Sequence, residues 1–335
     1  VVAIDINDGS IVTLFSSQTF STNQLANGIL QKDFDELLLS EEKPFFNRAL
    51  RGRYPPASSI KPAIAMYGIE EGLIDWNFSI FDEGFFTLPE DGRIYRDWKE
   101  GGHGDTNLFK AITQSSNTYF FDLAYRSDIN QLNKHLSSLG FGGKACIDCF
   151  EEDKVFVPEP SWKMNKHNFG WFKGDTVNMG VGQGYLVSTP IQLAKYAYIM
   201  ANKGKFSDLS LKKDLVKSEK SIEFNKFSND DWFKLHESMV NVIEGNTGTA
   251  RRLRERKNYI VAAKTGTAEL VSGDNREQYS ETRLDDSLRD HALIIAFGPM
   301  PNPRYAVSVV VENGESGGSV AGPVAISVLN SLIQE

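Results

Sequence analysis

Residues 54–62 read Tyr-Pro-Pro-Ala-Ser-Ser-Ile-Lys-Pro, which sets a serine and a lysine three positions apart behind two consecutive prolines. The prolines fix the backbone and disfavour a helix upstream. We expect Ser58 to open a helix that continues to Gly72, with Lys61 on the same face. A serine hydroxyl needs a base to become a nucleophile, and a lysine is such a base only if burial or a nearby cation lowers its pKa. The stretch therefore predicts Ser58 as an acylated nucleophile and Lys61 as its base.

The same serine–lysine spacing occurs at Ser40–Lys43 and Ser210–Lys213, two charge-rich stretches that we expect to be solvated. Taken alone, Ser58 and Lys61 would be better explained as a helix N-cap followed by an exposed lysine. Two further stretches of the chain change this balance.

The first of these is Ser115-Ser116-Asn117, in the middle of a helix predicted from Leu108 to Tyr125. Serine and asparagine are poor residues for a helix interior. We interpret Ser115 as a proton relay and Asn117 as a ligand for a substrate amide. A polar helix face or a local bend would also explain the pattern, which Ser21–Asn23 matches too.

The second is a predicted strand, Tyr259–Ala268, that contains the sequence Lys-Thr-Gly-Thr. Lys264, Thr265 and Thr267 can hold a substrate carboxylate, and Gly266 lets a ligand approach the backbone closely. If this strand lies at a sheet edge, a peptide can bind along it by strand addition, and its free N–H groups can serve an oxyanion hole. An ordinary amphipathic edge strand is the alternative.

Composition limits the class of protein. The chain has 335 residues, 41% of them hydrophobic, and a net charge of 36 − 44 = −8, which disfavours a nucleic-acid partner. No window is apolar enough for a membrane span, and no signal peptide is evident. Because the chain opens on a strand without an initiator methionine, we expect it to be a fragment whose N-terminal part has been removed.

The order of the expected elements is a hairpin, a helical middle, three strands and a final helix. Helices packed on an antiparallel sheet are the natural architecture for this order. We expect irregular structure over 75–103, a surface excursion over 150–174 and a mobile polar loop over 270–287. The expected strands are 1–6, 11–16, 259–268, 292–298 and 305–311, the expected helices are 130–139, 189–202, 230–244 and 321–333, and 20–53 should hold loops and short helices.

The only two cysteines, Cys146 and Cys149, are separated by two residues. A single C-x-x-C can be redox-active or half of a zinc site. No second pair of ligands lies nearby in the sequence. We expect two small apolar residues in a loop, while a disulfide in an oxidising compartment stays open.

The three motifs together, in this order and on these element types, are typical of penicillin-binding proteins and class A β-lactamases. Over essentially its whole length the chain resembles the transpeptidase domain of the penicillin-binding protein 2 family, the elongation-specific class B enzymes of rod-shaped Gram-negative bacteria. The stretches that carry this resemblance beyond the motifs are Val2–Asp5, Asp8-Gly9, Asn27–Ile29, Asn47–Ala49, Tyr54–Pro56, Tyr95–Trp98, Gly102–Gly104, Gly174-Asp175, Gly182–Tyr185, Thr189–Gln192 and Leu288–Ala292.

The resemblance implies an α+β fold with a five-stranded antiparallel sheet flanked by helices, plus an all-helical subdomain. The sheet lobe would comprise about 1–57 and 245–335, and the helical lobe about 58–244. An N-terminal anchor and a pedestal region would lie outside this fragment. The domain would then be periplasmic and held at the inner membrane.

The resemblance also implies the chemistry of peptidoglycan crosslinking. Ser58 would attack the D-Ala-D-Ala carbonyl of a stem peptide, release D-Ala and form an acyl-enzyme that an acceptor amine resolves. Lys61 would be the base, and Ser115 and Lys264 would pass the proton to the leaving amine. Lys264 would also keep Lys61 neutral by like-charge repulsion.

Substrate binding is implied in the same way. Asn117 would hold the donor amide, Thr265 and Thr267 would hold the terminal carboxylate beside Gly266, and the N–H groups of Ser58 and Thr267 would stabilise the oxyanion. β-Lactams would acylate the serine. The expected partners are lipid-linked peptidoglycan precursors and a SEDS-type glycosyltransferase of the rod-shape machinery. A carboxypeptidase side activity is also implied.

Two other functions stay open. A serine β-lactamase would need a base for deacylation, for which Glu151, Glu152 and Glu159 are available in the 150–174 stretch. A β-lactam sensor would acylate without further catalysis. The extended peptide-binding features argue against the sensor.

The chain departs from the family at two places. Ala57 precedes the serine where relatives commonly have glycine. Some relatives bind structural zinc with two aspartates, a histidine and a cysteine; Asp82, Asp97 and His103 match the first three, but Ser116 stands at the cysteine position. Because zinc prefers a thiolate to a hydroxyl, we expect a hydrogen-bonded cluster without metal and no other cofactor.

Overall fold

A five-stranded antiparallel sheet joins the two ends of the chain in the computed structural model, which describes residues 1–213, 218–270 and 288–334. The strand order is β2-β1-β11-β10-β9, so β9 lies at an edge. The expected hairpin and the three later strands are confirmed. Their bounds are Val2–Asp5 for β1, Ile11–Leu14 for β2, Ala262–Ala268 for β9, His291–Gly298 for β10 and Tyr305–Val311 for β11.

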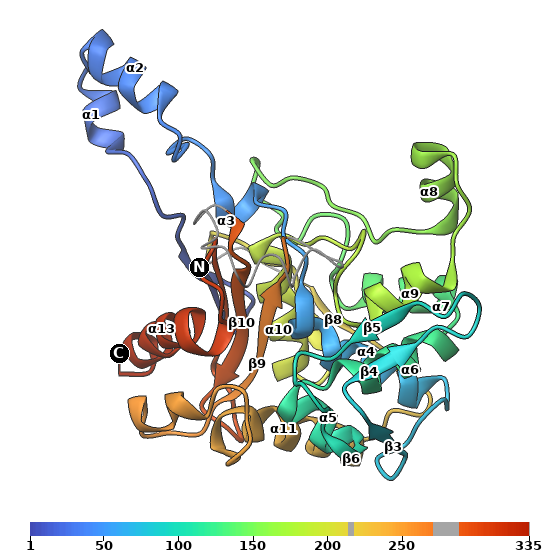
Figure 1. Ribbon diagram of the computed structural model, residues 1–335. Helices are drawn as coiled ribbons and strands as arrows, with labels where there is room; N and C mark the ends of the chain where they lie inside the picture. The colour runs from blue at the N-terminus through green and yellow to red at the C-terminus, as the bar shows by residue number, and fades with distance from the viewer. Residues whose placement is uncertain (214–217, 271–287, 335) are drawn as a thin grey trace.

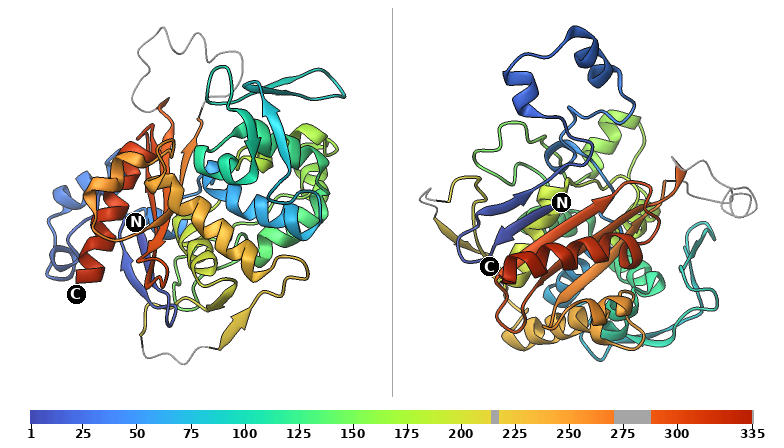
Figure 2. Two further views of the ribbon diagram at one scale, coloured as in Figure 1. Left: turned by 90° about the horizontal axis from the view of Figure 1, so that it is seen from below. Right: turned by 90° about the vertical axis from the view of Figure 1, so that its left-hand side faces the viewer.

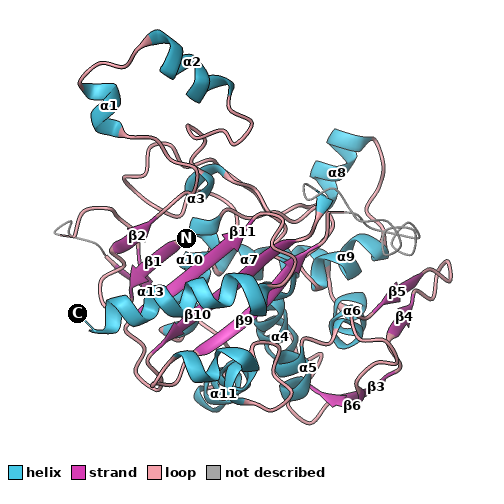
Figure 3. Cartoon of the chain, turned by 60° about the vertical axis from the view of Figure 1, so that its left-hand side comes forward, coloured by secondary structure: helices cyan, strands magenta, loops and turns pink. Residues whose placement is uncertain are grey.

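Both faces of the sheet are covered, which explains the nearly continuous apolar run of β10. Leu293, Ile295 and Phe297 belong to the core that includes helix α10 (Pro190–Ala201). The alternate residue Ile294 packs with helix α13 (Gly322–Gln334) in a second cluster on the opposite face. Figure 2 shows the sheet between α13 and the helical part of the molecule, and Figure 3 shows α13 lying across the sheet.

Helix α10 begins as the sequence predicts. Thr189 accepts from the Gln192 N–H, the Gln192 side chain accepts from the Thr189 N–H, and Pro190 occupies the first helical turn. This helix falls in the expected helical lobe yet packs against β1, β10 and β11. The boundaries of the two lobes stay a prediction.

The other elements lie around this frame. Helix α11 runs beside β9, and α1 and α2 stand away from the body at the upper left of Figure 1. The remaining bounds are Thr22–Ala26 (α1), Gln31–Leu39 (α2), Arg48–Arg51 (α3), Ala57–Ile60 (a 3-10 turn), Lys61–Glu70 (α4), Leu108–Gln114 (α5), Asn117–Arg126 (α6), Ile129–Ser138 (α7), Pro160–His167 (α8), Lys173–Gly180 (α9), Asn229–Glu244 (α11) and Arg251–Arg256 (a 3-10 helix).

Three expectations need correction. The 75–103 stretch is not irregular throughout, because backbone pairing builds short strands there. The 150–174 stretch contains the helix α8. The helix expected over 108–125 is two helices, α5 and α6. The polar loop expected over 270–287 lies almost wholly outside the described residues. The short strands are Ser79–Asp82 (β3) paired with Gly104–Asn107 (β6), Phe85–Thr87 (β4) with Ile94–Arg96 (β5), and Lys205–Ser207 (β7) with Glu219–Ser221 (β8).

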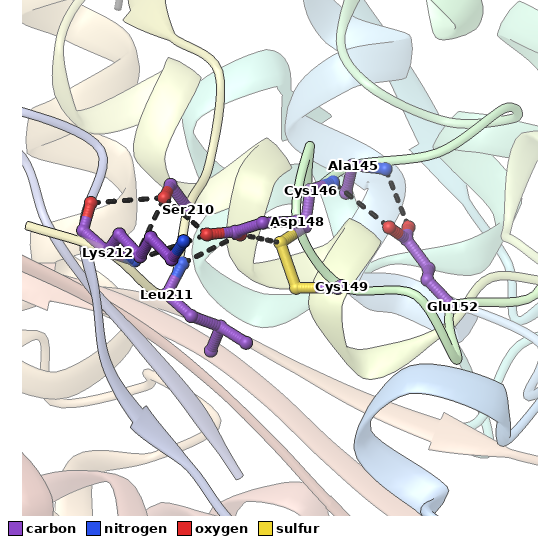
Figure 4. The surroundings of a disulfide bond; sticks show 8 residues. All are labelled: Ala145, Cys146, Asp148, Cys149, Glu152, Ser210, Leu211 and Lys212. Carbon is purple, nitrogen blue, oxygen red and sulfur yellow. Dashed lines mark hydrogen bonds between the residues drawn. A yellow bond between two sulfur atoms is a disulfide. The ribbon is translucent and has the colours of Figure 1, made fainter. Parts of the chain in front are cut away.

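The two cysteines form a disulfide, the possibility that the sequence left open (Figure 4). The loop turns back on itself and places the two Cα atoms 5.4 Å apart, within reach of a disulfide. Within the loop, the Asp148 carboxylate accepts from the N–H of Leu211 at 2.9 Å. The buried Glu152 carboxylate accepts from two loop N–H groups, at 2.6 and 3.0 Å. The loop that carries the disulfide is therefore also held in place by the hydrogen bonds of Asp148 and Glu152.

Across the described ranges, no helix combines the length and the hydropathy needed to span a bilayer.

Candidate active site

The three sequence motifs meet at the outer edge of β9. The 3-10 turn that carries Ser58 packs against β9, and α4 begins at Lys61 directly behind it. The break between α5 and α6 places Ser115 against the amines of Lys61 and Lys264. Segments separated by more than 140 residues thus form one site.

The nucleophile turn differs from its expected geometry. Ser58 does not cap an α-helix, because residues 57–60 form a 3-10 turn before α4 starts. Ala57 has φ of 49°, in the left-handed region where a Cβ is disfavoured, which gives a physical reason for glycine at this position in relatives. Its N–H donates to the Gly182 carbonyl at 2.8 Å, and this bond helps to hold the turn.

The junction at Ser115 is a left-handed bend. Ser115 has φ of 60°, which ends α5, and the Ser116 hydroxyl caps α6 by accepting from the Tyr119 N–H at 3.2 Å. The stretch is therefore a local bend, while the role of Ser115 as a proton relay stays a prediction. A non-glycine residue in this conformation is strained, and such strain is common at functional sites.

Ser115 Oγ lies between the two lysines, 3.3 Å from Lys61 Nζ and 2.8 Å from Lys264 Nζ. Lys61 Nζ also contacts the Asn117 side-chain oxygen at 2.7 Å and the Ser115 carbonyl at 2.8 Å. Among the described residues no hydrogen bond joins it to Ser58, contrary to the expected contact. Catalytic hydrogen bonds are often long before substrate binds.

Burial lowers the pKa of both amines. Desolvation lowers the pKa of Lys61 to about 7, although the charges of Asp97 and Asp82 oppose this change. Desolvation also holds the pKa of Lys264 well below its usual value, with repulsion from Lys61 adding to it. Burial is the main cause for both amines, and the repulsion appears as an effect of Lys61 on Lys264, so the expectation that Lys264 keeps Lys61 neutral stays a prediction.

The edge strand presents its motif in two directions. Lys264 and Gly266 are buried, and a Cβ on Gly266 would lie 3.1 Å from the Pro56 carbonyl, so the glycine lets the nucleophile turn approach β9. Thr267 is exposed. The Thr265 hydroxyl shares a hydrogen bond of 2.7 Å with the Thr249 hydroxyl.

Directly behind Ser115 lies a buried cluster of Asp82, Asp97, His103 and Ser116. Asp97 accepts from the N–H of Asn117 at 2.6 Å and from that of Thr118 at 3.0 Å, at the start of α6. His103 Nε2 lies 3.3 Å from Asp97, and the Ser116 hydroxyl donates to Asp82 at 2.7 Å. Burial raises the pKa of Asp97, but the His103 hydrogen bond, the Lys61 charge and backbone N–H groups outweigh burial and leave it well below its usual value.

The donor set fits zinc poorly. The ligand atoms of Asp82, Asp97 and His103 lie within 4.8 Å of one another, close enough to share an ion. The fourth position is the Ser116 hydroxyl, which already caps α6 and donates to Asp82. Each carboxylate also has an N–H donor, so the charges are balanced by hydrogen bonds.

Three residues of the site have no motif of their own. Trp98 donates its indole N–H to the Ser115 carbonyl at 3.1 Å, Thr249 meets Thr265, and Gln183 Nε2 donates to the Thr267 carbonyl at 3.3 Å. The sequence marked Trp98 and Gln183 only as parts of a family resemblance. Thr249 carried no signal.

Comparison with known proteins agrees with this geometry. Residues 1–330 match the family described as "Penicillin binding protein transpeptidase domain". The chain is 39% identical to peptidoglycan D,D-transpeptidase MrdA of Acinetobacter baumannii over 96% of its own length and 48% of that protein, and 34% identical to MrdA of Escherichia coli K12 over 99% and 54%. It thus spans about half the length of the curated relatives it matches.

Solved structures give the same result. Pseudomonas aeruginosa PBP2 in complex with WCK 5153 superimposes with a TM-score of 0.89 at 35% identity, covering 100% of this chain and 73% of that one. PBP2 of Helicobacter pylori, solved with MreC, gives a TM-score of 0.90 at 29% identity over 99% and 59%. The expected α+β fold is confirmed, and the chain belongs to the penicillin-binding-protein transpeptidase domain family.

Proposed function

We propose that this domain is a peptidoglycan D,D-transpeptidase of cell elongation and a covalent target of β-lactams. The observation that carries the proposal is the Ser115 hydroxyl held between two buried lysines, beside the turn of Ser58 and the free edge of β9. This arrangement supplies a nucleophile, a base of lowered pKa, a proton relay and a strand for peptide binding.

In the acylation step, neutral Lys61 takes the hydroxyl proton of Ser58 as its oxygen attacks the carbonyl of the penultimate D-Ala. The N–H groups of Ser58 and Thr267 stabilise the oxyanion. The tetrahedral intermediate then breaks its C–N bond. The proton reaches the leaving D-Ala amine through Ser115 and Lys264, whose Oγ and Nζ atoms lie 2.8 Å apart.

In the second step the amine of an acceptor peptide attacks the acyl-enzyme. Its proton returns by the same relay, and the Ser58 oxygen leaves as a hydroxyl. Asn117 binds the donor amide, and Thr265 and Thr267 bind the terminal carboxylate that leaves with D-Ala. Gly266 contributes by letting β9 approach the nucleophile turn closely.

A β-lactamase is the less favoured alternative. Of its candidate bases, Glu152 is buried and accepts from the N–H groups of Ala145 and Cys146, and Glu159 pairs with the Ser161 hydroxyl. Glu151 is exposed. A penicilloyl adduct that persists for many minutes is expected of the transpeptidase, whereas rapid turnover would favour the lactamase. A sensor would acylate but fail to crosslink peptides.

The cluster behind the site works without a metal in this proposal, and the domain needs no cofactor. Zinc analysis of the purified domain should give far less than one ion per chain, whereas Ser116→Cys, which restores a thiolate, should bind zinc. Stoichiometric zinc in the unaltered protein would contradict the proposal.

The proposed setting is the periplasm, on a protein anchored in the inner membrane. The disulfide of Cys146 and Cys149 supports this setting, because disulfides persist in oxidising compartments. The substrates are stem peptides on lipid-linked precursor, and the proposed partner is a SEDS-type glycosyltransferase. A related solved structure, at 25% identity and a TM-score of 0.83, is a peptidoglycan synthase complex that coordinates polymerization and crosslinking.

Labelling with a fluorescent penicillin tests the central claim. Ser58→Ala should abolish the covalent label. Ser40→Ala, which alters a serine of the same spacing at the end of α2, should leave the label unchanged. Labelling that survives Ser58→Ala would refute the assignment of the nucleophile.

A further inference from the structure

Gln183 lies in the turn after α9, and its side chain extends to the edge of β9. Its backbone N–H donates to the Asn178 carbonyl at 3.0 Å, and the neighbouring Gly182 carbonyl accepts from Ala57. Its side chain reaches the Thr267 carbonyl at 3.3 Å. One short segment therefore contacts both the nucleophile turn and the edge strand.

The bonded carbonyl lies on the outer edge of the sheet. Among the described residues, β9 pairs with β10 alone, and Thr267 lies opposite Ala292. In an antiparallel pair, the N–H and C=O of one residue point to the same side. Because Gln183 reaches this C=O from outside the sheet, both polar groups of Thr267 face the edge where a peptide strand would add.

Strand addition depends on such free edge groups. A peptide lying along β9 needs the Thr267 carbonyl as acceptor for one of its own amide N–H groups. In the structure the Gln183 carboxamide holds that acceptor. We propose that Gln183 is a specificity-determining residue, whose carboxamide competes with a ligand amide N–H for the Thr267 carbonyl along β9.

This inference rests on the proposed function and adds a prediction about ligand chemistry. A ligand with an acylamide side chain must exchange one neutral hydrogen bond for another. A ligand without that N–H binds while Gln183 stays in place. Because one neutral hydrogen bond has a modest net value, the effect on acylation should be about two- to ten-fold.

The test compares acylation rates of two β-lactams. Benzylpenicillin carries an acylamide N–H, whereas imipenem carries a hydroxyethyl group at the corresponding carbon. Gln183→Met keeps the side-chain length and removes the donor. Gln131→Met, a change of an exposed glutamine on α7, is the matched control. Second-order rate constants are measured for each protein, normalised to the titrated fraction of acylable serine.

We expect Gln183→Met to acylate about two- to ten-fold faster with benzylpenicillin and to change by less than two-fold with imipenem. Gln183→Asn, whose shorter side chain falls short of the carbonyl, should show the same selectivity. An unchanged ratio between the two drugs, or a parallel loss for both, would overturn the inference while leaving Ser58 acylation intact. If neither drug acylates Ser58 in the unaltered protein, the proposed function itself fails.

Discussion

Two buried clusters of ionisable groups lie back to back along Ser115-Ser116-Asn117, and burial leaves them in opposite states, one near neutral and one charged. On the catalytic side, the pKa values of Lys61 and Lys264 are lowered, so the amines approach neutrality. On the other side, the pKa of Asp97 is lowered as well, which keeps the carboxylate charged. Burial alone would push both groups toward their neutral forms.

The difference lies in the hydrogen-bond partners. Asp97 is hydrogen-bonded to His103 and accepts from two N–H groups at the start of α6, where the helix dipole also favours a negative charge. Lys61 and Lys264 are hydrogen-bonded only to neutral acceptors among the described residues. The Lys61 charge also repels that of Lys264. The anions in turn attract the Lys61 charge and oppose the lowering of its pKa. The rear cluster therefore opposes a further fall in the pKa of Lys61, the proposed base, and helps to keep it near neutral pH, where a general base works best.

Removing the base should have the largest effect. Lys61→Ala takes away the group that we propose accepts the Ser58 proton, and acylation by penicillin should slow by about 10²- to 10⁴-fold. Stopped-flow measurement of the adduct gives the rate. Lys43→Ala, at the matching position of the solvated Ser40–Lys43 pair, should acylate normally. A rate within ten-fold of the unaltered protein would show that another group is the base.

The pH dependence of stability tests the claim about the cations. The pKa of Lys61 is about 7 in the folded protein and near 10.5 when unfolded, so between these values the unfolded state binds more protons. The free energy of unfolding should therefore rise with pH over this window, by up to about 1.4 kcal/mol per unit. Urea titrations between pH 7 and 9 measure the slope. Lys61→Met should reduce it, and an unchanged slope would contradict a neutral buried amine.

The pH dependence of acylation follows from the same shift. Above pH 7 the amine is largely unprotonated and can accept the Ser58 proton, so the rate should fall as the pH decreases through about 7.

The anionic side is tested by Asp97→Asn. The amide keeps one oxygen for the N–H groups of α6 but loses the charge that strengthens these bonds, so unfolding should cost about 2–3 kcal/mol less. The Lys61 pKa should also fall, because one attractive charge is gone, and the acylation profile should move to lower pH. Chemical denaturation and the pH profile measure the two effects. A variant with unchanged stability and an unchanged pH profile of acylation would show that Asp97 does not influence Lys61.

The sequence predicted the sheet and the motif positions because these depend on local patterns. The apolar runs of β9, β10 and β11 and the Thr189-Pro190 helix start are readable from neighbouring residues. The serines and lysines of the motifs also indicate nucleophilic and acid–base chemistry.

Other features depend on contacts between distant segments. The left-handed conformation of Ser115 divides one predicted helix, and nothing in its neighbours demands a positive φ. The bond from Gln183 to β9, the pairing of Thr249 with Thr265 and the disulfide loop at Cys146 require the tertiary fold. The three hydrogen-bond acceptors of Lys61 belong to the Ser115–Asn117 bend and could not be foreseen.

The smallest expected effect concerns the serine that joins the two clusters. Ser116→Ala removes the cap on α6 and the hydrogen bond to Asp82, which should cost about 1–2 kcal/mol of folding free energy. Acylation should change by less than a few-fold, because Asp97 still holds the N–H groups of Asn117 and Thr118 and keeps Ser115 against the lysines. Urea denaturation and penicillin acylation measure the two quantities. A large loss of acylation with unchanged stability would mean that the Ser116 hydroxyl acts on the catalytic amines themselves, and the division into a catalytic and a supporting cluster would have to be redrawn.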